Sequence, residues 1–431
     1  MIAGSATWSA VDQGVFEYWT DTNNWTPATV PNGPTDVATF PSSTSLNTLP
    51  EINTPIELDS MIFDPGCPSY FTIEVDGALT MSGGGIINNS GSTKVIYVKP
   101  YPAGEFDFTN SAVAGGGYCS IVSYQRTIRF FDTSSAGSAY LTADDSNVAS
   151  TSSLIEFDDN SSGGTAFISL LHGPRSISPG VLSIYNHQAP GVSIGALNGS
   201  GDVLLGATDG PPTGRNLTVG TSNQYTLFTG TLQDAGKGGS LTKVGTGQFV
   251  LKGANLYNGG TLVSDGQLLV ANTTGSGTGS GQVKVTRRGI LGGTGVIAGS
   301  VTVGTGRGTG GKLTPGIAST TFSTLTIQGL LTFKGGGIYA PRVYGSSGTA
   351  DQVQANGVTI ENGARISLPG ANQGTVPPDA VYTVISNTAN TSISGTFSNL
   401  ADGGTLTVGN NTFQANYEGG DGNDLVLTVV P

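Results

Sequence analysis

The chain has 431 residues, of which 68 are glycine and only 11% are charged, and its formal net charge is −12. No long stretch is rich in the residues that favour helices, which argues against a helical bundle, a coiled coil and an α/β enzyme with crossover helices. The negative charge opposes binding to nucleic acid and to an anionic membrane surface. An all-β chain with a large core remains.

The segment 1–40 is rich in aromatic side chains, and all three tryptophans of the chain lie in it. The residues expected to make contacts here are Trp8, Phe16, Tyr18, Trp19 and Trp25. Such rings dominate interface energetics, and their flat faces also stack on sugar rings. We expect this segment either to cap the end of its own fold or to connect the chain to a neighbouring chain or a glycan.

The region 41–190 contains strands of varied length, such as 71–75 (FTIEV) and 94–98 (KVIYV), separated by polar loops. This pattern predicts an irregular β-sandwich or an elaborated β-helix. Cys67 and Cys119 are the only cysteines, and no CxxC motif points to a metal. The sequence leaves open whether they form a disulfide, a buried thiol pair or two unrelated thiols.

Acidic residues cluster in two loops of this region, at Asp144, Asp145, Glu156, Asp158 and Asp159. Paired carboxylates serve as general acid and base on polysaccharides, and they also bind calcium. In loops rich in serine and asparagine, however, acids are usually solvated turn residues. The two histidines, His172 and His187, are too few for a metal site, and no G-x-S-x-G elbow is present. We therefore predict no catalytic residues and no metal site here.

From about residue 191 to 431 a short unit, glycine followed by alternating apolar residues, recurs at short intervals. Each unit supplies a short strand, and its glycine permits a tight corner. Strands this short require stacking, which predicts a right-handed parallel β-helix with about 22 residues per turn. A Greek-key sandwich is the rival fold, but its longer antiparallel strands fit these short loops less well.

A stretch inside this region carries a more specific pattern. Its characteristic positions are Lys243, Gly245, Gly247, Phe249 to Leu251, Gly253, Ala254, Asn255, Tyr257, Gly259, Gly260, Thr261, Gly266 and Leu268. In this order they resemble the autotransporter-associated β-strand repeat of secreted bacterial β-helix proteins, and the resemblance is clearest over 238–317. It implies a β-helix exported to the cell surface or beyond, more often structural or adhesive than catalytic.

Both ends of the chain show weaker resemblances. Trp8, Trp25, Pro31, Asp36 and Phe40 stand as in the opening of many large secreted proteins with such repeats. The stretch 417–431 (YEGGDGNDLVLTVVP) resembles the segment before a Pro-Glu-Pro C-terminal sorting signal of Gram-negative bacteria. The N-terminal residues MIAGSATW lack the basic and apolar regions of a signal peptide, so Met1 either replaces a removed signal or begins a mature form.

The C-terminal stretch also fits a calcium-binding nonapeptide, with Asp421 and Asp424 as candidate ligands. Such sites form between stacked copies, and one copy is present, so a final turn and terminal strand is the simpler interpretation. We expect an open strand edge at this end, to which a neighbouring chain adds. Its contact residues are Leu425, Val426, Leu427 and Val429.

Together these features predict an extracellular or cell-surface structural protein of bacterial origin, which forms or decorates a fibre, sheath or matrix. Its partner is another copy of the chain, with extracellular polysaccharide as a further partner. The alternative function is a polysaccharide-binding or polysaccharide-degrading β-helix protein, a lyase or hydrolase. No enzyme activity and no cofactor are expected, apart from the calcium alternative, and no apolar run is long enough to span a membrane.

Overall fold

A computed structural model describes residues 4–11, 17–100, 104–145, 151–174, 176–188, 190–308, 310–316, 322–344, 349–371 and 375–431. In this part of the chain the fold is a parallel β-solenoid with 48% of residues in strands, and its single helical element is the 3-10 helix η1 (Thr22–Asn24). The predicted parallel β-helix is therefore confirmed. The chain divides into two compact units, unit 1 (1–222) and unit 2 (223–431).

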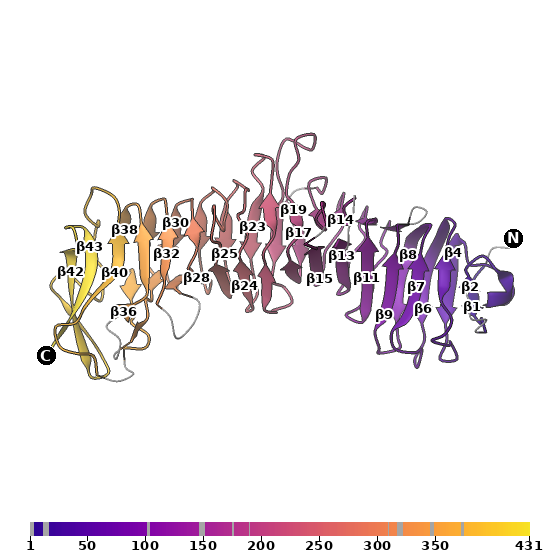
Figure 1. The fold of residues 1–431 in the computed structure, drawn as a ribbon, viewed down its shortest axis with the longest axis horizontal. Coiled ribbons are helices and arrows are strands. Elements are labelled where there is room, and N and C mark those ends of the chain that lie inside the picture. Colours follow the sequence, from indigo (N-terminus) through magenta and orange to yellow (C-terminus); the bar gives the residue numbers. More distant parts are fainter. Residues whose placement is uncertain are drawn as a thin grey trace. The chain divides into compact units, whose positions relative to one another are not determined.

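Unit 1 is built mainly from two sheets of stacked strands (Figure 1). In spatial order the first contains β3 (Trp25–Thr26), β1 (Ala6–Trp8), β4 (Gly33–Phe40), β6 (Ile56–Phe63), β8 (Ala78–Asn88), β10 (Glu105–Phe108), β12 (Thr127–Phe130), β14 (Leu154–Phe157), β16 (Val181–Ser183) and β19 (Asp202–Leu204). The second contains β2 (Glu17–Tyr18), β5 (Pro50–Ile52), β7 (Phe71–Val75), β9 (Lys94–Val98), β11 (Cys119–Tyr124), β13 (Tyr140–Asp145), β15 (Phe167–His172) and β18 (Ala196–Gly199). A third face begins with β17 (Gly191–Ile194) and β20 (Asn216–Val219).

Unit 2 has three large sheets and one two-stranded sheet. One contains β21 (Thr226–Phe228), β24 (Gln248–Leu251), β26 (Gln267–Val270), β28 (Ile290–Gly293), β31 (Lys312–Pro315), β34 (Ile338–Tyr339) and β39 (Arg365–Ile366). The next contains β23 (Ser240–Lys243), β25 (Thr261–Val263), β27 (Val283–Val285), β30 (Val301–Val303), β33 (Leu331–Phe333) and β38 (Val358–Ile360). The third contains β29 (Val296–Ile297), β32 (Thr324–Ile327), β37 (Gln352–Ala355), β40 (Val381–Asn387), β43 (Asp424–Val430), β42 (Asn411–Gly419) and β41 (Thr405–Val408). Short strands β22 (Thr231–Gln233), β35 (Val343–Tyr344) and β36 (Thr349–Ala350) complete the unit.

One part of the chain takes one of its two predicted arrangements, and another part differs from the prediction. Parallel stacking already runs through β6, β8, β10, β12 and β14, so the region 41–190 is an elaborated β-helix and not a sandwich. At the other end, β40, β43, β42 and β41 pair antiparallel. From β40 onward the region 191–431 therefore leaves the parallel pattern, because longer strands joined by tight turns fold back on one another.

Strand alternation decides which side chains fill the core. In β12, Ile128 and Phe130 are fully buried inside the solenoid, whereas Thr127 and Arg129 face outward. Stacked turns bring equivalent positions together: the Phe108 and Phe130 rings are stacked at 4.9 Å, and the Phe130 and Phe157 rings at 4.7 Å. The period-2 pattern of each short strand thus produces continuous inner and outer ladders along the stack.

Turn length varies more than the sequence pattern suggests. Gln248 pairs with Gln267 on the next turn, whereas Ile338 pairs with Arg365, so the second of these turns is clearly the longer. Corners absorb the difference, and some of them require glycine. At Gly336 the backbone has a φ of +81°, and a Cβ would lie 2.1 Å from the Gly308 oxygen. A side chain there has no room because neighbouring corners stack at the strand spacing.

Three polar residues of the repeat-like stretch, Lys243, Tyr257 and Asn255, have structural roles in unit 2. Lys243 is buried and donates to the carbonyl oxygens of Val244 and Gly245 at 2.6 and 2.9 Å, and burial lowers its pKa to about 8. The Tyr257 hydroxyl is fully buried and bonds the Thr261 hydroxyl at 2.6 Å. Lys243 thus pairs carbonyl oxygens of a corner, and the Tyr257 and Thr261 hydroxyls pair with each other, so that none of these buried groups is left without a partner.

Asn255 joins three successive turns of unit 2. Its Oδ1 accepts the Leu232 N–H at 2.8 Å, and its Nδ2 donates to the Gly277 oxygen at 2.6 Å. We expect Asn255→Ala to lower the free energy of unfolding by ~2–3 kcal/mol, because it leaves two buried backbone groups without partners. Chemical denaturation measures the change, and Asn258→Ala, at a nearby exposed site, is the matched control. Equal stability of the two variants would contradict this role.

Among the described residues, no helix is long and apolar enough to cross a membrane.

Candidate functional site

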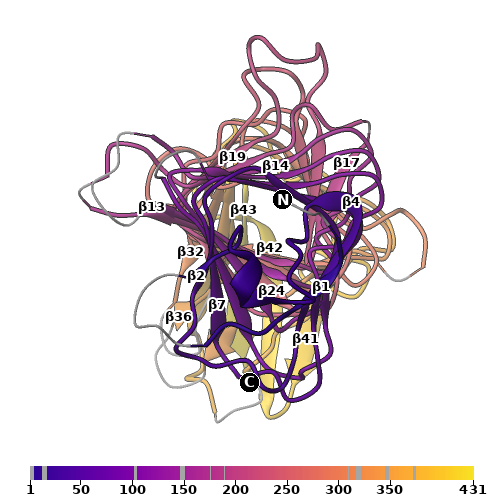
Figure 2. The same ribbon diagram turned by 90° about the vertical axis from the view of Figure 1, so that its right-hand side faces the viewer.

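The aromatic residues of the first segment are buried in their own chain. Trp8, Trp19 and Trp25 are at most 2% exposed, and their rings pack on one another and on Phe40 with centroids 4.7 to 6.5 Å apart. Each indole N–H is also satisfied, for example by the Pro31 oxygen at 2.9 Å from Trp19. Figure 2 shows this segment lying across the N-terminal end of unit 1. The three tryptophans thus lie inside their own chain.

This burial corrects the contact role predicted for the three tryptophans. A ring that fills the end of its own solenoid has no face free for a glycan or a neighbouring chain. Tyr18 differs, since its side chain is 48% exposed. Phe16 lies outside the described residues.

The predicted C-terminal edge is also corrected. β43 lies between β40 and β42 and pairs with both, so its backbone has no open edge. The four residues assigned to assembly are all buried, with exposures of at most 7%: Leu425, Val426, Leu427 and Val429. The outer strand of this sheet is β41, whose residues are exposed or half-buried. After β40 the chain forms the hairpin of β41 and β42, which lies outside β43 in the sheet. The edge strand is therefore β41 and not the last strand of the chain, and the order of strands along the sequence does not predict this.

Cys67 and Cys119 are free, buried thiols, so the disulfide alternative is wrong. Burial raises the pKa of each thiol to about 11, which keeps both protonated and unreactive at neutral pH. Lys94 lies near both and donates to the Pro68 oxygen at 2.9 Å. Its contacts hold a loop corner closed, as those of Lys243 do in unit 2.

The five candidate acids, Asp144, Asp145, Glu156, Asp158 and Asp159, lie at two places in unit 1. Asp144 and Asp145 end β13, and Asp145 accepts hydrogen bonds from the backbone and hydroxyl of Ser153. Asp159 sits at a left-handed corner and accepts the Asp132 N–H at 3.1 Å. Because these contacts close corners, Asp145 and Asp159 have structural roles. Of the remaining two acids, Glu156 lies on β14 of the other sheet and Asp158 directly follows that strand.

Glu156 belongs to a ladder of polar side chains at one register on four consecutive strands, in which Ser183 is buried and the other three are half-buried. Asp107, Arg129, Glu156 and Ser183 occupy paired positions on β10, β12, β14 and β16. Arg129 binds both oxygens of Asp107, at 2.8 and 3.0 Å, and the Ser183 hydroxyl donates to Glu156 at 3.2 Å. We call these four residues the acid–arginine ladder. Parallel pairing repeats them at the spacing of the turns, about 4.8 Å.

Asp158 and Tyr185 extend this ladder at its edge. Burial, followed by the carboxylates of Glu156 and Asp159, raises the pKa of Asp158 to about 6. Its Oδ1 is buried and has no hydrogen-bond partner among the described residues. Burial raises the pKa of Tyr185 as well, with smaller contributions from the carboxylates of Glu156, Asp209 and Asp158. The site therefore contains a carboxyl group with a pKa of about 6 and a phenol whose pKa is raised by burial and by carboxylates that include Asp158.

Sequence reasoning selected Glu156 and Asp158 but missed Asp107, Arg129, Ser183 and Tyr185. A signal was present, because the strands EFDF, TIRF and LIEF place polar residues at the same alternate position. Only the register of the strands brings these positions side by side. That register depends on loop length, whose effect composition does not predict.

Asp421 and Asp424 lie in the hairpin between β42 and β43 and at the start of β43. Asp424 accepts the Asn387 N–H at 2.8 Å and so ties this hairpin to β40. Within the described residues, no group of three or more histidine, cysteine or acidic side chains is arranged to hold a metal. His187 is buried between the Ser161 and Gln188 oxygens, and His172 is exposed.

Comparison of this chain with known protein families and with curated proteins finds no match.

Ionised Asp158 is expected to destabilise the fold at neutral pH. Its folded-state pKa of about 6 exceeds the ordinary 3.8, so the folded state binds the proton more tightly than the unfolded state. The destabilisation is full above about pH 6 and vanishes below about pH 4. Asp158→Asn should raise the melting temperature by about 2 °C at pH 7.5 and leave it unchanged at pH 3.5. Exposed Asp209→Asn is the control, and an equal rise at both pH values would contradict the assignment.

Proposed function

We propose that the protein is an extracellular structural and adhesive β-solenoid that decorates a bacterial surface matrix by holding polysaccharide on its lateral faces. The observation that carries this proposal is the acid–arginine ladder with Asp158 and Tyr185. Carboxylates accept and guanidinium and hydroxyl groups donate hydrogen bonds to sugar hydroxyls, and a phenol ring adds an apolar face. Groups repeated along stacked turns suit a ligand that also repeats.

The ends of the solenoid support a lateral mode of binding. At the N-terminal end of unit 1 the tryptophan rings are buried and β3 pairs antiparallel, and the strands that end unit 2 also pair antiparallel. In these sheets the parallel stack does not continue to the edge, which opposes end-to-end addition of another chain. Self-assembly into a fibre would use the exposed edge of β41. Thr407→Pro places a proline in that strand and should block pairing at this edge. Sedimentation velocity of the variant and of the unmodified protein measures whether assembly depends on β41.

Binding to neutral polysaccharides tests the lateral mode. The purified protein is titrated with soluble β-glucan, xylan and mannan in affinity electrophoresis and calorimetry. We expect Glu156→Ala combined with Tyr185→Ala to weaken binding at least about tenfold, since two polar contacts of roughly 1 kcal/mol or more are lost. Glu361→Ala in unit 2 is the matched control. Absence of binding to every glycan, or equal binding by the double variant, would overturn the proposal.

A second candidate function is hydrolysis of a glycosidic bond at the same site. The observation that favours it is Asp158, whose pKa of about 6 lets the carboxyl group carry a proton close to neutral pH. A general acid requires this property, and Glu156 would supply the second carboxylate. Release of reducing ends from the same glycans, lost in Asp158→Asn, would establish the enzyme. Binding without turnover would leave the adhesive function.

A further inference from the structure

The two units differ strongly in charge. Unit 1 contains 6 basic and 20 acidic residues, whereas unit 2 contains 11 basic and 9 acidic residues. The overall charge of −12 therefore conceals a unit with a small positive excess. Net charge therefore favours attraction of an anionic ligand to unit 2 over unit 1.

Four of the basic residues of unit 2 line two adjoining clefts with volumes of about 410 and 340 Å³. Arg307 and Arg365 line the larger cleft, and Lys284 and Lys334 line the smaller one. The clefts adjoin along the corners at 304–306 and 334–335. We call the two together the basic groove.

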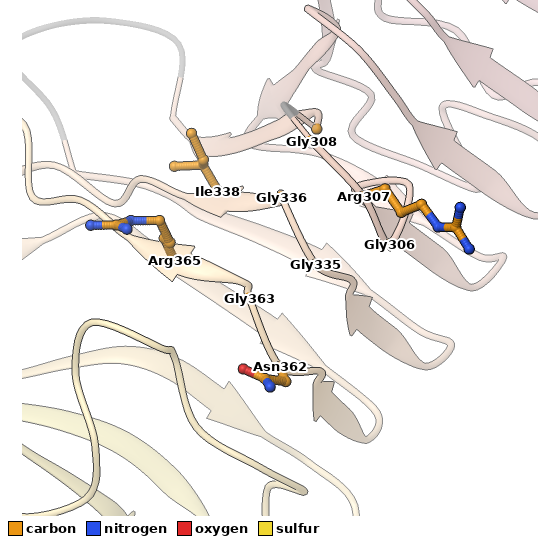
Figure 3. A pocket seen from close by; sticks show the side chains of 10 residues that line it. Gly306, Arg307, Gly308, Gly335, Gly336, Ile338, Asn362, Gly363 and Arg365 are labelled. Carbon is orange, nitrogen blue, oxygen red and sulfur yellow. The ribbon is translucent and has the colours of Figure 1, made fainter.

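Glycine backbone forms the floor of the larger cleft. Its corners stack through hydrogen bonds, from Gly306 to the Gly335 oxygen and from Gly336 to the Gly363 oxygen, each at 3.0 Å. In Figure 3 the Arg307 and Arg365 side chains lie on opposite sides of this floor. The N–H groups of Gly335 and Gly363 have no acceptor among the described residues. The floor thus admits a ligand close to the backbone, with a cation on either side.

The cations of the groove are not neutralised by the protein. Arg288 and Arg342 of the same unit pair with Asp265 and Asp351. By contrast, none of the four groove cations forms an ion pair with a carboxylate of the described residues, and no lining residue is acidic. The nearest acid in sequence, Glu361, is exposed and outside the lining. Four unpaired cations on adjacent turns create a positive strip.

We infer that the basic groove binds a carboxylated polysaccharide, which deepens and rests on the proposed binding of polysaccharide. Arginine pairs with carboxylates through two parallel hydrogen bonds. The remaining polar side chains of the lining, Gln282, Thr286, Thr302, Thr305 and Asn362, suit sugar hydroxyls. Single-stranded nucleic acid fits less well, because the lining has no aromatic ring for base stacking.

Titration with polygalacturonate oligomers and with their methyl esters tests this inference. We expect the charged oligomer to bind and the ester, which lacks the carboxylates, to bind at least tenfold more weakly. Arg307→Gln combined with Arg365→Gln should weaken binding of the charged oligomer at least tenfold and reduce its dependence on salt. Lys237→Gln combined with Lys252→Gln removes the same charge elsewhere in unit 2 and should leave affinity within twofold.

The outcomes separate this inference from the proposed function. If the protein binds no neutral glycan but still binds polygalacturonate through Arg307 and Arg365, the acid–arginine ladder is overturned as a binding site and the basic groove is supported. If the protein binds neutral glycans, and the arginine and lysine double variants bind polygalacturonate with equal affinity, only the basic groove is overturned. If no glycan of either kind binds, both fail. Tighter binding of single-stranded DNA of equal length, lost in the arginine variant, would overturn the assigned ligand class.

Discussion

Trp19→Ala is expected to lower the free energy of unfolding by about 3–5 kcal/mol, the usual cost of removing a large buried aromatic side chain. Trp19 is fully buried, its ring contacts Trp25 with centroids 4.7 Å apart, and its N–H donates to Pro31. In a solenoid each turn is stabilised chiefly by its neighbours, so the loss should concentrate at the N-terminal end. Hydrogen exchange in β1, β4 and β6 should rise before that in later strands.

Tyr18→Ala provides the control for this experiment. Tyr18 is adjacent to Trp19 in sequence but 48% exposed, so its removal should cost less than about 1 kcal/mol. Denaturant unfolding and exchange mass spectrometry compare the two variants directly. Similar losses, or an exchange increase spread evenly over unit 1, would show that Trp19 does not cap the end. Increased aggregation of Trp19→Ala would agree with exposure of the strands beneath.

Phe130→Ala should destabilise the middle of unit 1 by a similar amount, about 3–5 kcal/mol. Its ring is stacked between those of Phe108 and Phe157, with an interplanar angle of 9° on each side. Truncation leaves a cavity and removes two ring contacts at once. Phe130→Leu refills most of the volume and is expected to recover part of the loss.

The neighbouring Phe131 offers a matched control. It is half-buried, and the Arg129 guanidinium lies 5.5 Å from its ring centre. Phe131→Ala should therefore cost about 1 kcal/mol, the scale of an exposed cation–π contact. Calorimetric melting distinguishes the two, and a loss at Phe131 as large as that at Phe130 would contradict the assignment of the core face.

Short strands and frequent glycines in the sequence were sufficient to predict the class of fold. Units such as Gly266 to Val270 leave little room for anything but stacked turns, because so short a strand cannot form a stable pair alone. In strands such as 127–130 the alternation of apolar and polar residues agrees with which residues face the core. These are local properties, and local sequence contains them.

Tertiary structure decided what the ends and the faces do. Whether Trp8 and Trp19 cap or connect depends on the path of the chain around Phe40, and their aromatic character alone fits both. The burial of Leu427 follows from a hairpin that places β42 outside it. The alignment of Arg129 with Glu156 depends on loop lengths that set the register. Each is a contact between residues far apart in sequence, which a pattern of neighbours along the chain cannot specify.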